Sequence, residues 1–214
     1  MSVVTYTETS VFGICESRTP MVFSIREQRR PMKQTVLKPH DLVVALKLCL
    51  DRTATFGTAA RDLHLSASEV HGAVARGVRA GFLQAAEERA PLRAHRPILA
   101  ALQEFLDHGV KYAFPAVLGS ITRGVATAHA ASPLSERISD PSGDPPPVWP
   151  DPTGKVRGMA LCPLYPGAPA AAASDERLRQ LLVLIDALRV GRARERELAR
   201  ELIPGILASR GQPS

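Results

Sequence analysis

Cysteine is scarce in this chain of 214 residues, which contains only three: Cys15, Cys49 and Cys162. They lie far apart and form no Cys-x-x-Cys pair, so the sequence suggests neither a disulfide framework nor a zinc module. Cys49 stands within an apolar segment, where a small hydrophobic core residue is the expected role.

Long hydrophobic runs are also missing from the sequence. No apolar run reaches the length of a membrane span, and the first residues lack the basic start and apolar centre of a signal peptide. We therefore expect a cytoplasmic protein that does not contact a membrane.

The sequence lacks familiar catalytic motifs. It has no Gly-rich phosphate loop, no His-Glu-x-x-His and no Gly-x-Ser-x-Gly, and its six histidines are scattered. We expect no catalytic residues, no metal and no cofactor. An enzyme with a site in residues 115–165 is a weaker alternative, for which Arg123 and His129 are the polar loop residues to consider.

The composition indicates a globular protein with an anionic partner. With 45% hydrophobic and 22% charged residues, the chain can bury a core. Its formal net charge of +6 weakly favours nucleic acid as that partner.

Residues 55–83 carry the clearest pattern, which predicts two helices joined by a tight turn. Ser66 is a strong N-cap for the second helix, because its hydroxyl can accept from a free backbone amide while Glu69 reaches back in a capping box. Gly81 follows the end of that helix. An apolar stripe runs along it, made of valines at every fourth position: Val70, Val74 and Val78.

The motif Ala-Ala-x-x-Leu-x-Leu-Ser-x-Ser-x-Val, followed by Arg76 and a closing Ala-Gly-Phe-Leu, resembles the winged helix-turn-helix of bacterial MarR-like transcription regulators. The resemblance covers residues 38–84 only. His64 stands where that family usually has a turn glycine, but histidine tolerates a left-handed backbone. Gly77 replaces a larger helix residue, at a cost of about 1 kcal/mol relative to alanine.

The resemblance implies that the polar face of the second helix binds double-stranded DNA. The residues expected there are Ser66, Ser68, His71, Gly72, Arg76 and Arg79. A helical hairpin that merely packs is the alternative reading of the same pattern. Residues 85–91 have no β-branched residue and no hairpin turn, so the wing should be reduced or rebuilt as a loop.

We expect a mainly α protein, with an N-terminal winged helix-turn-helix domain, a loop-rich segment and C-terminal helices. Residues 1–37 read as a flexible extension, 38–112 as the DNA-binding domain, 113–173 as a Pro/Gly-rich irregular segment, and 174–209 as helices. The extension is either a basic arm or the product of an over-called start codon. A protein starting at Met32 should be as stable and active as the full chain, because residues 1–31 offer no face to bury.

Two finer expectations concern the second half of the chain. Residues 147–149 and 156–161 could pair as a hairpin, with Trp149 and Tyr165 anchoring the irregular segment. The final helices should begin at a Ser174 cap.

The apolar face Leu178–Leu188 is wider than a small domain needs, which predicts a homodimer contact. The charged run Gly191–Glu201 reads as a solvated or dimer-interface helix, with a second DNA-contacting helix as the alternative.

Taken together, these features predict sequence-specific DNA binding by a dimeric transcription regulator without catalysis. The alternative is a protein-interaction module, such as an antitoxin or adaptor with an operon-encoded partner, that uses a winged-helix fold.

Overall fold

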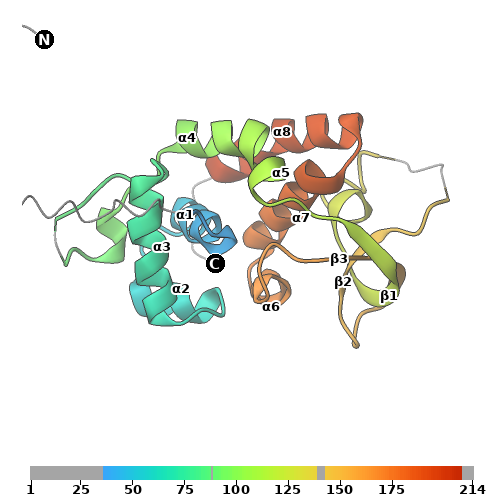
Figure 1. Ribbon diagram of the computed structural model, residues 1–214, viewed down its shortest axis with the longest axis horizontal. Coiled ribbons are helices and arrows are strands. Elements are labelled where there is room, and N and C mark those ends of the chain that lie inside the picture. Colours follow the sequence, from blue (N-terminus) through green and yellow to red (C-terminus); the bar gives the residue numbers. More distant parts are fainter. Residues whose placement is uncertain (1–35, 88, 139–142, 209–214) are drawn as a thin grey trace, which may run out of the picture. The chain divides into compact units, whose positions relative to one another are not determined.

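Helices dominate the part of the chain that the computed structural model describes, residues 36–87, 89–138 and 143–208, and a small three-stranded sheet accompanies them (Figure 1). The expectations for the N-terminal extension, including Met32, fall outside the described residues, as does Cys15. Backbone contacts group residues 35–214 into one unit.

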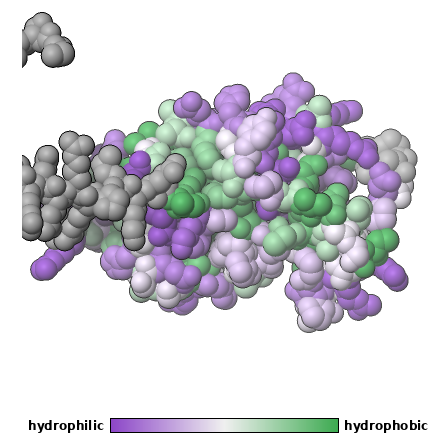
Figure 2. Space-filling model, viewed as in Figure 1, coloured by the Kyte–Doolittle hydropathy of each residue, from purple (hydrophilic) through white to green (hydrophobic). Residues whose placement is uncertain are grey.

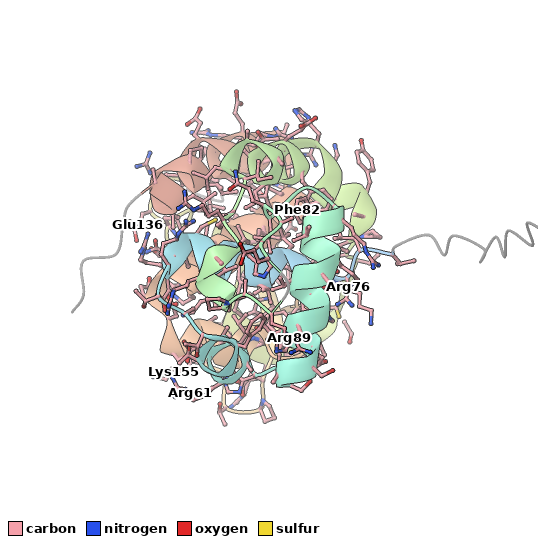
Figure 3. The ribbon with its side chains drawn as sticks, turned by 90° about the vertical axis from the view of Figure 1, so that its left-hand side faces the viewer. Arg61, Arg76, Phe82, Arg89, Glu136 and Lys155 are labelled. Carbon is pink, nitrogen blue, oxygen red and sulfur yellow. The ribbon has the colours of Figure 1, made fainter. Side chains whose placement is uncertain are left out.

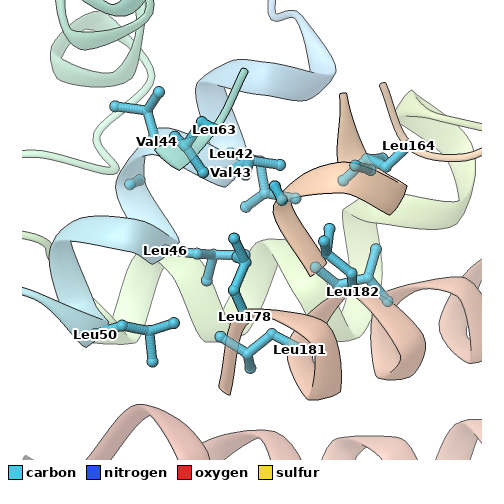
Figure 4. Packing of buried hydrophobic residues seen from close by; sticks show 14 of the residues in the cluster. Leu42, Val43, Val44, Leu46, Leu50, Leu63, Leu164, Leu178, Leu181 and Leu182 are labelled. Carbon is cyan, nitrogen blue, oxygen red and sulfur yellow. The ribbon is translucent and has the colours of Figure 1, made fainter. Parts of the chain in front are cut away.

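The first helix, α1 (Pro39–Leu50), is buried almost all round, as its apolar sequence predicts. Pro39 occupies the first turn, where its missing amide hydrogen costs nothing. Figure 4 shows the leucines and valines of α1 packed between Leu63 and the leucines Leu178, Leu181 and Leu182. The helix therefore joins the N-terminal and C-terminal helices in one core.

The two helices predicted within residues 55–83 are present as α2 (Phe56–Asp62) and α3 (Ala67–Arg79), joined by a tight turn. Ser66 caps α3: its hydroxyl accepts from the Glu69 amide at 3.2 Å, and the Glu69 carboxylate accepts from the Ser66 amide at 2.7 Å. His64 adopts the left-handed backbone that its position required, with φ of 51°. Gly81, with φ of 77°, follows the end of α3.

The segment after α3 is closed by one isolated antiparallel bridge between Leu83 and Pro97, not by a hairpin of two strands in its described residues. Two hydrogen bonds, from Gln84 N to Arg96 O and from Ile98 N to Phe82 O, join its two ends, each at 2.8 Å. Between them lies a loop with the short 3₁₀ turn η1 (Leu92–Ala94). A loop thus stands where a wing would be, as the lack of strand-forming residues predicts.

A broken helix follows, made of α4 (Leu99–Glu104), a π-helical turn η2 (Phe105–Gly109) and α5 (Val110–Ala113).

The sheet contains β1 (Leu118–Ala126), β2 (Pro147–Pro150) and β3 (Val156–Leu161), with a short 3₁₀ turn η3 (Ala128–Ala130) after β1. β1 pairs antiparallel with both other strands, and β2 and β3 pair in parallel, which closes the sheet on itself. The two segments predicted to pair as a hairpin, residues 147–149 and 156–161, do pair with each other, but in parallel, so the predicted hairpin is wrong. Each of them also pairs antiparallel with β1, where no strand was expected.

Glycines permit this closure. A Cβ at Gly124 would collide with the backbone of Trp149, and one at Gly158 with the backbone of Pro146. Side chains at these positions would hold the strands apart.

The chain ends with α6 (Ala168–Ser174), α7 (Glu176–Val190) and α8 (Ala193–Ala208). Asp175 caps α7 by accepting from the Leu178 amide at 3.0 Å, so Ser174 is not its cap.

The dimer contact predicted on Leu178–Leu188 does not fit the structure, because the leucines of this face are at most 1% exposed within the chain's own core. α8 continues through Pro204.

A buried lysine ties three helices together. Nζ of Lys47 on α1 lies 3.0 Å from Asp175 Oδ2, at the start of α7, and 3.3 Å from Asp62 Oδ2 on α2. Burial lowers the pKa of Lys47, but the hydrogen bonds to both carboxylates outweigh it and raise the pKa above its ordinary value.

None of the helices described is both long and apolar enough to span a bilayer.

Candidate nucleic-acid interface

One side of α3 is buried and the other faces solvent. The buried side packs on α1 and α2 through Val70, Ala73, Val74 and Gly77. The exposed side presents Ser68, His71, Ala75 and Arg79, spaced three or four residues apart. The sequence therefore located this exposed side correctly at Ser68, His71 and Arg79.

His71 is held in place by an aromatic neighbour. Its ring stacks on Phe56 of α2 with 3.7 Å between ring centroids and 14° between ring planes. Phe56 is the first residue of α2, whose Thr55 cap accepts from the Thr58 amide at 3.1 Å. The two helices together therefore fix the orientation of an exposed imidazole, which can donate or accept a hydrogen bond.

Arg76 does not belong to this exposed side. Its guanidinium donates to both carboxylate oxygens of Asp41 on α1, from Nε at 2.8 Å and from Nη2 at 2.7 Å. Asp41 is fully buried, so Arg76 neutralises a carboxylate that would otherwise be unpaired. The sequence placed Arg76 on the same polar face as Arg79, but in the structure its guanidinium is used within the fold.

Gly72 and Ser66 also serve the fold in this structure. A Cβ at Gly72 would lie 3.0 Å from the Arg76 guanidinium, so glycine leaves room for that side chain to reach Asp41. The Ser66 hydroxyl is engaged in the capping box with Glu69.

His40 completes the group around Asp41. Nη2 of Arg76 lies 3.1 Å from His40 Nε2. A guanidinium can only donate, so His40 accepts through Nε2 and is neutral. Burial lowers the pKa of His40, which favours the same neutral form, and the nearby Arg76 also lowers it, while Asp41 opposes the shift. The hydrogen bond to Asp41 raises the pKa of Arg76.

Further arginines lie in the loop that follows α3. Arg89, Arg93 and Arg96 are all exposed. Figure 3 shows Arg89 beside α3, with Arg76 on the other side of the helix. Arg79 and Arg89 therefore add positive charge next to the exposed side of α3.

A cavity of about 600 Å³ separates α3 from this loop. Its α3 wall includes His71, Val78 and Arg79, and its loop wall includes Ala85 and Arg89. The exposed side of α3 is therefore bordered by a hollow with both apolar and basic lining.

A second polar group, which the sequence analysis missed, lies on the sheet side of the core. Oδ2 of Asp186 on α7 accepts from Trp149 Nε1 at 2.6 Å and from Thr127 Oγ1 at 2.9 Å, and Oδ1 accepts from Arg189 at 2.7 Å. Burial raises the pKa of Asp186, and these three donors oppose that shift. An aspartate inside the apolar run Leu181–Leu188 was the available signal.

This group holds the sheet against α7. Arg189 also donates to the backbone oxygens of Phe114 at 2.9 Å and Cys162 at 3.3 Å, just outside β1 and β3. Trp149 is therefore an anchor, as expected. Tyr165 is a second anchor, since its hydroxyl donates to Leu63 O at 2.9 Å.

The structure does not draw Arg123 and His129 into one site. Arg123 is exposed on β1, whereas His129 Nδ1 lies 3.6 Å from Glu195 on α8. Within the described ranges no His, Cys, Asp and Glu side chains gather in a group that could hold a metal ion.

Comparisons with protein families, with curated proteins and with solved structures found no match to this chain.

Proposed function

We propose that this protein binds double-stranded DNA through a helix-turn-helix, as a transcription regulator of the winged-helix type without catalytic activity. The observation that carries the proposal is the exposed side of α3, where Ser68, His71 and Arg79 project from a capped helix supported by α1 and α2. The reduced loop takes the place of a wing, and its Arg89 lies next to α3.

The chemistry of this side suits the major groove. An α-helix fits that groove, with residues of its N-terminal half nearest the base edges. Ser68 and His71 stand in that half of α3, and both offer hydrogen-bonding atoms. Arg79, at the C-terminal end, and Arg89 and Arg93 in the loop supply charge for phosphates on either side.

A two-fold dimer would place two copies of α3 in successive major grooves. Because Leu178–Leu188 is already covered inside the chain, such a dimer needs another surface. Light scattering at micromolar concentration, with and without duplex DNA, tests this part of the proposal, and a monomer under both conditions would contradict it.

The main experiment is fluorescence anisotropy over a salt series, with the gene's own upstream duplex and a scrambled duplex. We expect Arg79→Ala to weaken binding to both duplexes and to reduce the slope of log affinity against log salt by about 1, because one phosphate contact is lost. Arg194→Ala, at an exposed position of α8, is the matched control and should leave the slope unchanged.

His71→Phe separates base reading from packing. The new ring can still stack on Phe56, but it cannot hydrogen-bond a base edge. We expect a loss of about 1–3 kcal/mol on the upstream duplex and little change on the scrambled one. Unchanged affinity in folded Arg79→Ala and His71→Phe variants would remove α3 from the DNA interface.

The apolar part of the cavity favours a second candidate function, contact with a protein partner through the same side of α3. Val74, Val78 and Pro91 line this hollow and could receive an apolar side chain. This alternative would be favoured if Arg79→Ala left the salt dependence of the affinity unchanged on both duplexes.

A further inference from the structure

The small sheet leaves apolar side chains uncovered on β1, on the other side of the helical core from α3 (Figure 1). The exposed fractions are 53% for Ile121 and 42% for Val125, and 83% for Val117 just before the strand. Figure 2 shows hydrophobic surface in this region. Exposed aliphatic side chains that cluster in this way mark contact surfaces.

The same face of the sheet carries a pair of like charges. Arg123 lies between Ile121 and Val125 in the alternation of β1, and its partner across the antiparallel ladder is Arg157 of β3. The next pair on this face is Ile121 and Met159. Like charges directly opposite each other destabilise a sheet, so this arrangement does not serve the fold.

Neither arginine is neutralised by the rest of the described chain. The ion pairs formed by described residues include no carboxylate on Arg123 or Arg157. Lys155, one residue before β3, is also exposed. The face therefore combines an apolar centre with at least two positive charges that no carboxylate of the described residues pairs.

These observations select one kind of occupant. A second copy of the same face would bring four arginines together, which opposes self-association. Single-stranded nucleic acid binds on aromatic platforms, and the exposed side chains here are aliphatic. A partner protein whose apolar surface is flanked by carboxylates matches both the exposed aliphatic side chains and the unpaired charges of Arg123 and Arg157.

We propose that the exposed face of β1 and β3, made of Ile121, Arg123, Val125, Arg157 and Met159, is a docking surface for an acidic protein partner. The partner presents apolar side chains to Ile121 and Val125, and Asp or Glu side chains to the two arginines. This surface is separate from α3, so one chain can hold DNA and this partner at the same time.

Site-specific photo-crosslinking in the native host tests the proposal. A photoreactive amino acid replaces Val125 in the full chain, and mass spectrometry identifies the crosslinked peptide. We expect one other protein, linked through an apolar segment that contains Asp or Glu. The crosslink should fall at least tenfold in an Arg123→Glu, Arg157→Glu variant and return when the partner's carboxylates are changed to lysine.

The matched control is Arg137→Glu with Arg194→Glu, which makes the same change in charge at exposed positions outside the three strands. It should keep the crosslink, and circular dichroism should show all variants folded. The proposal is overturned if no crosslink forms, or if the crosslink joins another copy of this chain, nucleic acid or a peptide without acidic residues. It is also overturned if both charge-reversal variants retain the crosslink. These outcomes do not depend on whether α3 binds DNA.

Discussion

The helix-turn-helix and the small sheet use arginine in opposite ways. On α3, Arg76 is neutralised by the buried Asp41, with two hydrogen bonds shorter than 3 Å. On the sheet, Arg123 and Arg157 face each other across two strands, and the described residues supply no carboxylate to either. A basic side chain thus supports the fold in one region and opposes it in the other.

This difference shows why charge alone does not identify a binding residue. Arg76 and Arg79 stand three positions apart on one helix and look equivalent in the sequence. Among the described residues Arg79 has no ion-pair partner, whereas Arg76 is held by Asp41, because the side of α3 that carries Arg76 meets α1 there. The partner of a charge, rather than its position in the pattern, separates structural arginines from functional ones.

The strongest test of this comparison is Arg76→Ala. We expect the free energy of unfolding to fall by about 3–5 kcal/mol, because the substitution leaves Asp41 buried without its partner. Arg79→Ala, measured by urea unfolding under the same conditions, should change it by no more than about 0.5 kcal/mol. Similar small losses in both variants would show that the Asp41 pair is not structural.

The buried carboxylate on the sheet side should give the next largest effect. Trp149→Phe removes one donor from Asp186, and we expect a loss of about 1.5–3 kcal/mol, the range for hydrogen bonds to charged groups. Thr127→Val removes the other side-chain donor to the same oxygen and should cost a similar amount. Chemical unfolding followed by circular dichroism provides the measurement, since Trp149 is the only tryptophan. Losses below about 0.5 kcal/mol would contradict the anchoring role.

The pH dependence of stability tests the neutral His40 beside Arg76. Because the folded pKa of His40 is lowered from 6.5, the unfolded chain takes up a proton first as the pH falls. Stability should therefore be full above about pH 6.5 and decline as the pH falls through the folded pKa. His40→Gln, whose amide oxygen can accept from Arg76, should make urea midpoints decline less between pH 7.5 and 5. Parallel curves for the two proteins would rule this contribution out.

The smallest effect, opposite in sign, is expected on the sheet. Arg157→Gln removes the repulsion with Arg123, so the free energy of unfolding should rise by about 0.2–1 kcal/mol. Arg194→Gln, with the same loss of charge on α8, serves as the comparison and should have no such effect. A clear loss of stability in Arg157→Gln would mean that this arginine supports the fold.

Much of the helix-turn-helix could be predicted because its signals are local. The Ser66 cap, the left-handed His64 and the valine stripe of α3 each depend on residues within a few positions of one another. Two of the three strands, β2 and β3, were expected as extended segments, but β1 gave no comparable signal. β1 pairs with strands that begin at least 20 residues later. Gly124 of β1 and Gly158 of β3 lie in the segment predicted to be irregular, and they permit the close approach of the strands.

By itself, the sequence determined the helices other than α6, the turn and the exposed side of α3, since periodicity and capping act over one or two turns. Tertiary structure decided which charged groups are used within the fold. Asp41 meets Arg76 across 35 residues, and Trp149 meets Asp186 across 37. It also turned the wide apolar face of α7 inward, against α1 and α8. Such choices depend on which surfaces meet when the chain collapses, and no local pattern records them.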